Sequence, residues 1–82
     1  MDDLLEKEVI SIISEVSGFD VGEITPEKNL AEDLEIDSIK AIEITVAFEK
    51  KFKVSIRDED IPKITTVRES IDLIKGILNT ND

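Results

Sequence analysis

Apolar residues recur at the spacing of an α-helix in three separate segments, and this periodicity limits the folds open to the chain. The first segment covers about Asp3 to Val16, the second about Ser38 to Phe52, and the third follows Thr66. The apolar positions are Leu5, Val9, Ile12, Ile13, Val16, Ala41, Ile44, Phe48, Phe52, Val67, Ile71, Ile74 and Leu78. A chain of 82 residues supplies one hydrophobic core, so these helices have to pack against one another. We predict an all-α fold, a small four-helix bundle with three long helices and one short one.

The ends of the predicted helices carry residues that start or stop helices. Gly18 follows the last apolar position of the first segment, where a C-terminal glycine belongs. Asp37 is a candidate N-cap for the second helix. Thr66 and Glu69 have the spacing of a capping box for the last helix. We expect residues 79–82 to form a polar tail, and the chain to be a single domain over 1–82 with an ordered core of about 3–78.

The connection between the first two helices is long, about residues 18–37, and its pattern is weak. A loop of this length is unusual in a compact domain unless it is functional. We expect four apolar side chains to hold it against the core: Phe19, Ile24, Leu30 and Leu34. The short helix is expected as one turn from Asp58 to Ile61, stopped near Pro62.

The composition excludes several classes of function. The chain has no cysteine and no histidine, which rules out disulfides, thiolate metal sites and a Ser–His catalytic pair within it. A net charge of −10, with three phenylalanines as the only aromatic residues, argues against nucleic-acid binding. The acidic start and the short apolar runs match neither a secretory signal nor a membrane span. We therefore expect a cytoplasmic protein without membrane insertion that is not an enzyme.

An acidic run, residues 32–37, leads directly to Ser38 at the predicted start of the second helix. A helix N-terminus favours negative charge, so a phosphate ester on Ser38 would be stabilised there. On these residues alone, Ser38 is more simply part of a helix cap. A calcium loop that starts at Asp33 fails, because glycine and glutamate are required where Ser38 and Ile44 stand. We expect no specific metal site, although loose divalent-ion binding remains an alternative.

The same residues resemble the acyl carrier protein family over nearly the whole chain. The matching positions are Glu32-Asp33-Leu34, Asp37-Ser38-Ile39, Glu43, Ala47, Glu49, Phe52, Lys63-Ile64-Thr65-Thr66-Val67 and Ile71-Asp72. The resemblance implies a 4′-phosphopantetheine arm attached covalently to Ser38, with Asp37 as part of the attachment motif. A separate phosphopantetheinyl transferase would install the arm from coenzyme A, and acyl groups would be carried on it as thioesters.

The resemblance also implies where partners and cargo bind. The second helix would dock acyl-loading and acyl-processing enzymes with basic patches, through Ile39, Lys40, Glu43 and Val46. The acyl pocket would be lined by Ile42, Phe48, Ile64 and Ile71, for each of which core packing is the simpler interpretation. A shuttling carrier of this kind is expected to be a monomer. The cargo would enter fatty-acid, lipid or polyketide synthesis.

The sequence departs from the family pattern in four respects, and the last of them suggests a specialised carrier. Glu35 stands where the family usually has glycine, two positions before the motif aspartate. Ile39 replaces the usual leucine, and Phe48 is bulkier than the usual aliphatic residue. The second helix is less acidic than in typical fatty-acid carriers because it contains Lys40 and the pair 50–51.

Two alternative functions remain open on the sequence. One is a carrier for aminoacyl or peptidyl units, because the loading enzymes choose the cargo. The other is an acidic helical interaction module without a prosthetic group, which predicts that Ser38 cannot be modified.

Overall fold

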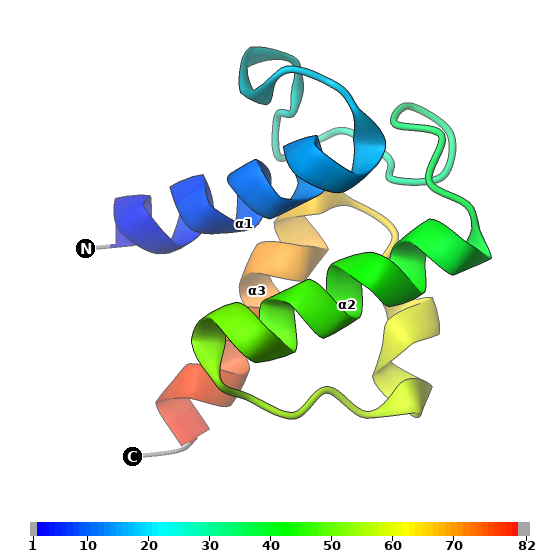
Figure 1. The fold of residues 1–82 in the computed structure, drawn as a ribbon. Helices are drawn as coiled ribbons and strands as arrows, with labels where there is room; N and C mark the ends of the chain where they lie inside the picture. The colour runs from blue at the N-terminus through cyan, green and yellow to red at the C-terminus, as the bar shows by residue number, and fades with distance from the viewer. Residues whose placement is uncertain (1, 81–82) are drawn as a thin grey trace.

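The computed structural model describes residues 2–80, and over that range the fold is all-helical (Figure 1). The elements in chain order are α1 (Asp2–Ser17), η1 (Val21–Glu23), α2 (Ser38–Phe52), η2 (Asp58–Lys63) and α3 (Val67–Thr80). Helices α1 and α2 run in opposite directions, and α3 passes behind them (Figure 1). The predicted fold class is confirmed, with the short helix present as the 3₁₀ helix η2.

The hydrophobic core is built by one stripe from each α-helix together with the loop residues. Its buried members are Val9, Ile13, Ile24, Leu30, Leu34, Ile36, Ile44, Phe48, Ile56, Val67, Ile71 and Ile74. Phe48 is the largest fully buried side chain, and its ring packs on the half-buried ring of Phe52 with centroids 6.2 Å apart. Ala41, Ile44, Phe48 and Phe52 all face inward, as helical periodicity predicts.

The helix ends behave as the local sequence predicts. Gly18 has a φ of +86°, a conformation that glycine adopts without steric cost, and its N–H donates to the Ser14 carbonyl at 2.9 Å. Thr66 and Glu69 form both hydrogen bonds of the capping box, at 3.0 and 3.2 Å. Helix α2 begins at Ser38 with Asp37 as its N-cap.

The long connection between α1 and α2 is packed against the bundle. Ile24, Leu30 and Leu34 are buried as predicted, and Phe19 is half-buried. Main-chain hydrogen bonds join the loop to the start of α3: the Leu30 N–H donates to the Thr65 carbonyl at 2.9 Å, and Val67 donates to the carbonyl of residue 28 at 3.1 Å. The start of α2 is therefore held on a fixed part of the fold.

Two details differ from the sequence prediction. The short turn contains Pro62 and continues to Lys63, because its hydrogen bonds span three residues and the proline nitrogen is not needed as a donor. Helix α3 continues through residue 80, into the predicted polar tail, since Ile77 and Leu78 keep its last turns against the core. Residues 81–82 lie outside the described range. No helix among the described residues is long and apolar enough to cross a membrane.

Candidate functional site

The loop before α2 is built around Asn29. The Asn29 side-chain oxygen accepts the Glu32 N–H at 2.8 Å, and the Asn29 N–H donates to the Asp33 carboxylate at 2.8 Å. The Asn29 carbonyl also accepts the N–H groups of Asp33 and Leu34. These bonds close residues 29–34 into a compact turn at the start of the acidic run.

Glu35 has a left-handed backbone conformation, with a φ of 54°. Glu35 is exposed, whereas its neighbours Leu34 and Ile36 are 1% and 5% exposed. The turn is closed by the Ile36 N–H, which donates to the Leu30 carbonyl at 2.9 Å. The backbone here is therefore one that favours glycine, the residue that the family pattern has at this position.

Asp37 and Ser38 form the start of α2. The Asp37 carboxylate accepts the Lys40 N–H at 2.8 Å, and the Asp37 carbonyl accepts the Ala41 N–H at 2.9 Å. Ser38 is the first residue of the helix and its side chain is exposed. Another protein can therefore reach a hydroxyl group that a well-capped helix holds in position.

A groove of about 880 Å³ extends from Ser38 between α2, η2 and α3. Its apolar walls include Ile42, Ile44, Phe48 and Ile64. Its volume is in the range of small-molecule binding sites.

The sequence-predicted pocket residues are only partly brought together. Ile42, Phe48 and Ile64 line the groove, whereas Ile71 lies in the hydrophobic core and is absent from the lining. Its neighbour Ser70 lines the groove instead. Two further polar residues of the lining are Thr45 and Glu49, neither of which the sequence analysis assigned to the pocket. Their spacing from Ser38 and Ile42 along the helix is the sequence signal that could have placed them on the same face.

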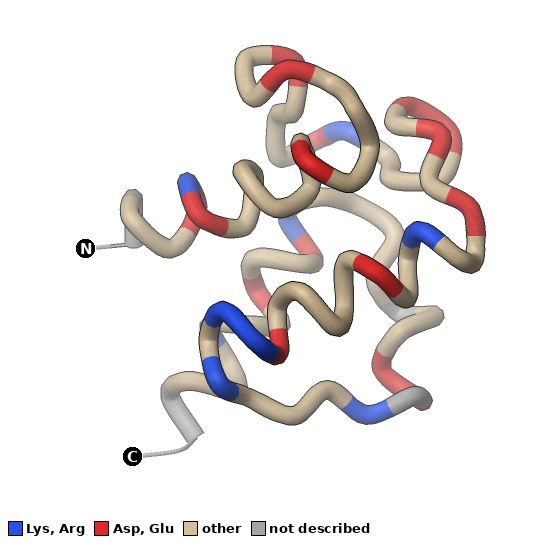
Figure 2. The backbone as a smooth tube through the Cα atoms, in the orientation of Figure 1, with Lys and Arg blue, Asp and Glu red and all other residues tan. Residues whose placement is uncertain are grey.

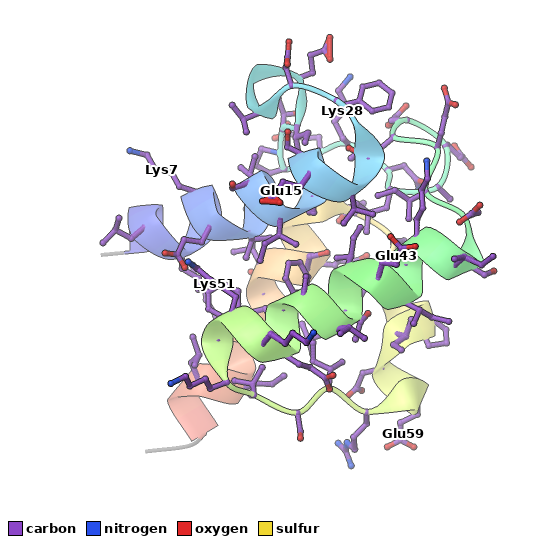
Figure 3. All side chains as sticks on the ribbon, viewed as in Figure 1. Lys7, Glu15, Lys28, Glu43, Lys51 and Glu59 are labelled. Carbon is purple, nitrogen blue, oxygen red and sulfur yellow. The ribbon has the colours of Figure 1, made fainter. Side chains whose placement is uncertain are left out.

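The outer face of α2 carries an exposed apolar stripe. Ile39 is 69% exposed, Ile42 54% and Val46 40%. Glu43 is exposed in the N-terminal half of the helix, and Lys40 is half-buried (Figure 3). Exposed apolar stripes with charged neighbours are typical of protein interaction surfaces.

Charge is distributed unevenly along this side of the molecule. Acidic residues gather in the loop that leads into α2, whereas Lys50 and Lys51 lie at the opposite end of the helix (Figure 2). The Lys51 ammonium lies 3.7 Å from the Glu8 carboxylate of α1. Among the residues that the structure describes, no three acidic side chains are grouped closely enough to hold a metal ion.

Comparison with known proteins identifies the family. The family model described as "Phosphopantetheine attachment site" matches residues 7–74, which include the acidic loop, Ser38 and all of α2. The chain belongs to the acyl carrier protein family. The resemblance seen in the sequence is thereby confirmed.

Individual acyl carrier proteins match nearly the whole chain. It is 38% identical over 81 residues to an acyl carrier protein of Petrotoga mobilis, covering 99% of this chain and 94% of the relative. It is 43% identical over 65 residues to one of Myxococcus xanthus, covering 79% and 82%. The crystal structure of an acyl carrier protein from Thermotoga maritima superposes with a TM-score of 0.84 at 33% identity, covering 99% and 94% of the two chains.

The family's cofactor is 4′-phosphopantetheine, attached covalently, and this acyl carrier protein fits it. An exposed serine hydroxyl starts a helix whose N-terminus favours a phosphodiester, and a groove runs from that position. When attached, the group supplies the thiol on which acyl units are carried. Acyl carrier proteins work with a phosphopantetheinyl transferase and with acyl-processing enzymes, and they act as carriers rather than catalysts.

Proposed function

We propose that Ser38 is the attachment residue and that the chain presents acyl thioesters to successive biosynthetic enzymes. The observation that carries the proposal is the position of Ser38. Its exposed side chain begins α2, directly after the Asp37 cap, and lines the end of an apolar groove. Loading a serine requires an accessible hydroxyl, and storing an acyl chain requires an adjoining apolar site.

The attachment step is a phosphoryl-type transfer carried out by the transferase. The Ser38 oxygen forms a bond to the phosphorus of the phosphopantetheine half of coenzyme A. The pyrophosphate P–O bond breaks, and adenosine 3′,5′-bisphosphate leaves with the bond electrons. The hydroxyl proton passes to a base of the transferase, because this chain has no histidine to accept it.

The residues around Ser38 have separate roles in this proposal. Asp37 fixes the first turn of α2 and so orients the hydroxyl. The acidic run 32–37 attracts partner surfaces that carry basic side chains, an attraction that salt weakens. Ile39, Lys40, Glu43 and Val46 form the docking surface, in which the apolar members bury area and the charged members set orientation.

The cargo belongs to fatty-acid, lipid or polyketide synthesis in this proposal, and the chain acts as a cytoplasmic monomer. A single covalent arm keeps each intermediate bound to the carrier between enzymes, so the intermediate reacts at high effective concentration. Lys40, Lys50 and Lys51 make α2 less acidic than in housekeeping carriers, which favours a dedicated set of partners.

Intact-mass measurement tests the attachment. The protein is incubated with coenzyme A and a broad-specificity phosphopantetheinyl transferase, and the expected result is one phosphopantetheine adduct. Ser38→Ala abolishes the adduct, whereas Ser55→Ala, which removes another exposed hydroxyl, retains it. A folded wild-type protein that gains no mass with this or other transferases would overturn the proposal in favour of an acidic interaction module.

A further inference from the structure

Two buried hydroxyl groups line the groove from different helices. Thr45 on α2 is 7% exposed and Ser70 on α3 is 0% exposed, and both belong to the groove lining. Their neighbours along the helices, Ile44 and Ile71, are buried apolar residues. Among the described residues that line the groove, Thr45 and Ser70 are the polar ones that are buried.

The hydrogen atoms of both hydroxyls are directed to their own helices. The Thr45 hydroxyl donates to the Ala41 carbonyl at 2.9 Å, and the Ser70 hydroxyl donates to the Thr66 carbonyl at 3.4 Å. A hydroxyl has one hydrogen and two acceptor lone pairs. Both oxygens thus keep acceptor capacity next to the groove, and they suit a ligand that donates a hydrogen bond.

Stability of the fold does not explain these two hydroxyls. Valine has nearly the shape of threonine, and at position 45 it would be buried without desolvating a polar group. Alanine is a better helix former than serine and would leave position 70 almost unchanged in shape. A hydrogen bond from a serine or threonine to the carbonyl four residues earlier slightly destabilises a helix. A ligand that donates hydrogen bonds to these two oxygens explains the presence of both residues.

A third acceptor lies on the same groove. Glu49 is half-buried in the lining, and its carboxylate accepts the Ile56 N–H at 2.8 Å, which holds it in place. The polar side chains that α2 and α3 add to the groove beyond Ser38 are therefore Thr45, Ser70 and Glu49, and each has an oxygen that can accept a hydrogen bond. The walls around them, such as Phe48 and Ile64, require an apolar chain.

We propose that the groove binds an acyl chain that carries a hydroxyl substituent, and that this hydroxyl donates a hydrogen bond to Thr45 or Ser70. The proposal rests on attachment of the cargo at Ser38. A neutral hydroxyl fits this environment because its desolvation is offset by one hydrogen bond. A protonated amine would lose much more hydration energy against these apolar walls. An unsubstituted chain leaves both acceptors without a donor.

The first experiment compares attached cargoes. The transferase loads Ser38 from octanoyl-, 3-hydroxyoctanoyl-, 8-hydroxyoctanoyl- or 8-aminooctanoyl-coenzyme A, and cleavage of each thioester by hydroxylamine is timed. We expect at least one hydroxylated cargo to be cleaved about threefold or more slowly than octanoyl, the effect of one net buried hydrogen bond. Thr45→Val with Ser70→Ala should remove that difference between the hydroxylated cargo and octanoyl.

Matched controls separate the groove from general effects. Ser14→Ala removes a half-buried hydroxyl on α1 that donates to the Phe19 carbonyl outside the groove, and it should keep the wild-type preference. Equal protection of all four cargoes would overturn the proposal. So would a preference that survives in the double variant, or stronger protection of the amine-bearing chain.

A second measurement does not depend on attachment. Unmodified protein is titrated with the N-acetylcysteamine thioesters of octanoate and of both hydroxyoctanoates, and amide shifts at Thr45 and Ser70 are followed by NMR. We expect a hydroxylated thioester to shift both amides at a lower concentration than the octanoyl thioester does. Equal or weaker binding would overturn the preference. A preference seen here without any adduct at Ser38 would overturn only the proposed attachment.

Discussion

Helices α2 and α3 begin with the same chemical problem and solve it differently. Each helix start leaves backbone N–H groups that need acceptors. At α2 the side-chain cap is a single bond, from the Lys40 N–H to Asp37. At α3 the Glu69 carboxylate accepts the N–H groups of both Thr65 and Thr66, and the Thr66 hydroxyl accepts the Glu69 N–H.

The two helix starts also differ in how extensively they are bonded to the rest of the fold. The start of α3 is bonded to the long loop through Leu30 and Val67 and has a β-bridge between Asn29 and Thr66. The start of α2 follows Glu35 in a left-handed conformation and exposes Ser38. One helix start joins distant parts of the chain, and the other leaves Ser38 exposed. The predictions below separate these two uses.

The largest stability effect is expected at the α3 start. Thr66→Ala removes the hydroxyl that caps Glu69 N–H and should lower the free energy of unfolding by about 1–2 kcal/mol. The loop should loosen with it, because its main-chain bonds end at the same turn. Urea unfolding gives the free energy, and Thr25→Ala, at an exposed loop threonine, is the control. A loss no greater than in the control would show that the capping box is dispensable.

The cap of α2 should matter less for stability and more for modification. Asp37→Ala should cost about 1 kcal/mol and slow phosphopantetheine transfer to Ser38, because the first turn loses its cap. Asp37→Asn keeps a good N-cap and should retain nearly all of the stability. If Asn also restores the transfer rate, the carboxylate acts by positioning. If Asp37→Asn is stable but is modified slowly, the transferase recognises the negative charge of Asp37.

Glu35→Gly tests whether strain is present at the α2 start. The left-handed conformation costs a residue with a side chain about 1–2 kcal/mol, and glycine loses about 0.5–1 kcal/mol through its greater freedom when unfolded. We therefore expect Glu35→Gly to raise the free energy of unfolding, measured by thermal denaturation, by about 0.5–1 kcal/mol. Glu32→Gly, at an exposed position without positive φ, should lower stability. If both variants are less stable than wild type, the backbone at Glu35 is not strained.

The smallest effect arises at the α3 start and depends on pH. The pKa of Glu69 is lowered below its ordinary value of 4.5, chiefly by the hydrogen bond from the Thr65 hydroxyl and then by the backbone N–H groups of Thr65 and Thr66. A lowered pKa in the folded state contributes stability that is complete above 4.5 and is lost as pH falls through the folded value. Glu69→Gln should therefore be slightly less stable than wild type at neutral pH, and the difference should narrow as the pH falls below 4.5. A constant difference across that range would exclude the titration of Glu69 as its source.

Local sequence determined the helices and most of their ends. The α2 limits, the Asp37 cap, the Gly18 stop and the Thr66–Glu69 capping box were all predicted from residues within four positions of one another. Such contacts form inside one helix turn, so the sequence spacing contains their geometry. The same local signals placed Asp37 and Ser38 at the start of α2, whereas their proposed role in attachment came from the resemblance to the acyl carrier protein family.

Tertiary structure decided which side chain of α3 lines the groove. Ser70 and Ile71 are adjacent on α3 and point about 100° apart, so the rotation of α3 against α2 determines which of them faces the groove. The structure places Ser70 there and Ile71 in the core. Glu35 likewise takes its left-handed conformation between Leu34 and Ile36, which both belong to the core. The contacts that bury these side chains join residues far apart in the chain, which periodicity within one helix does not encode.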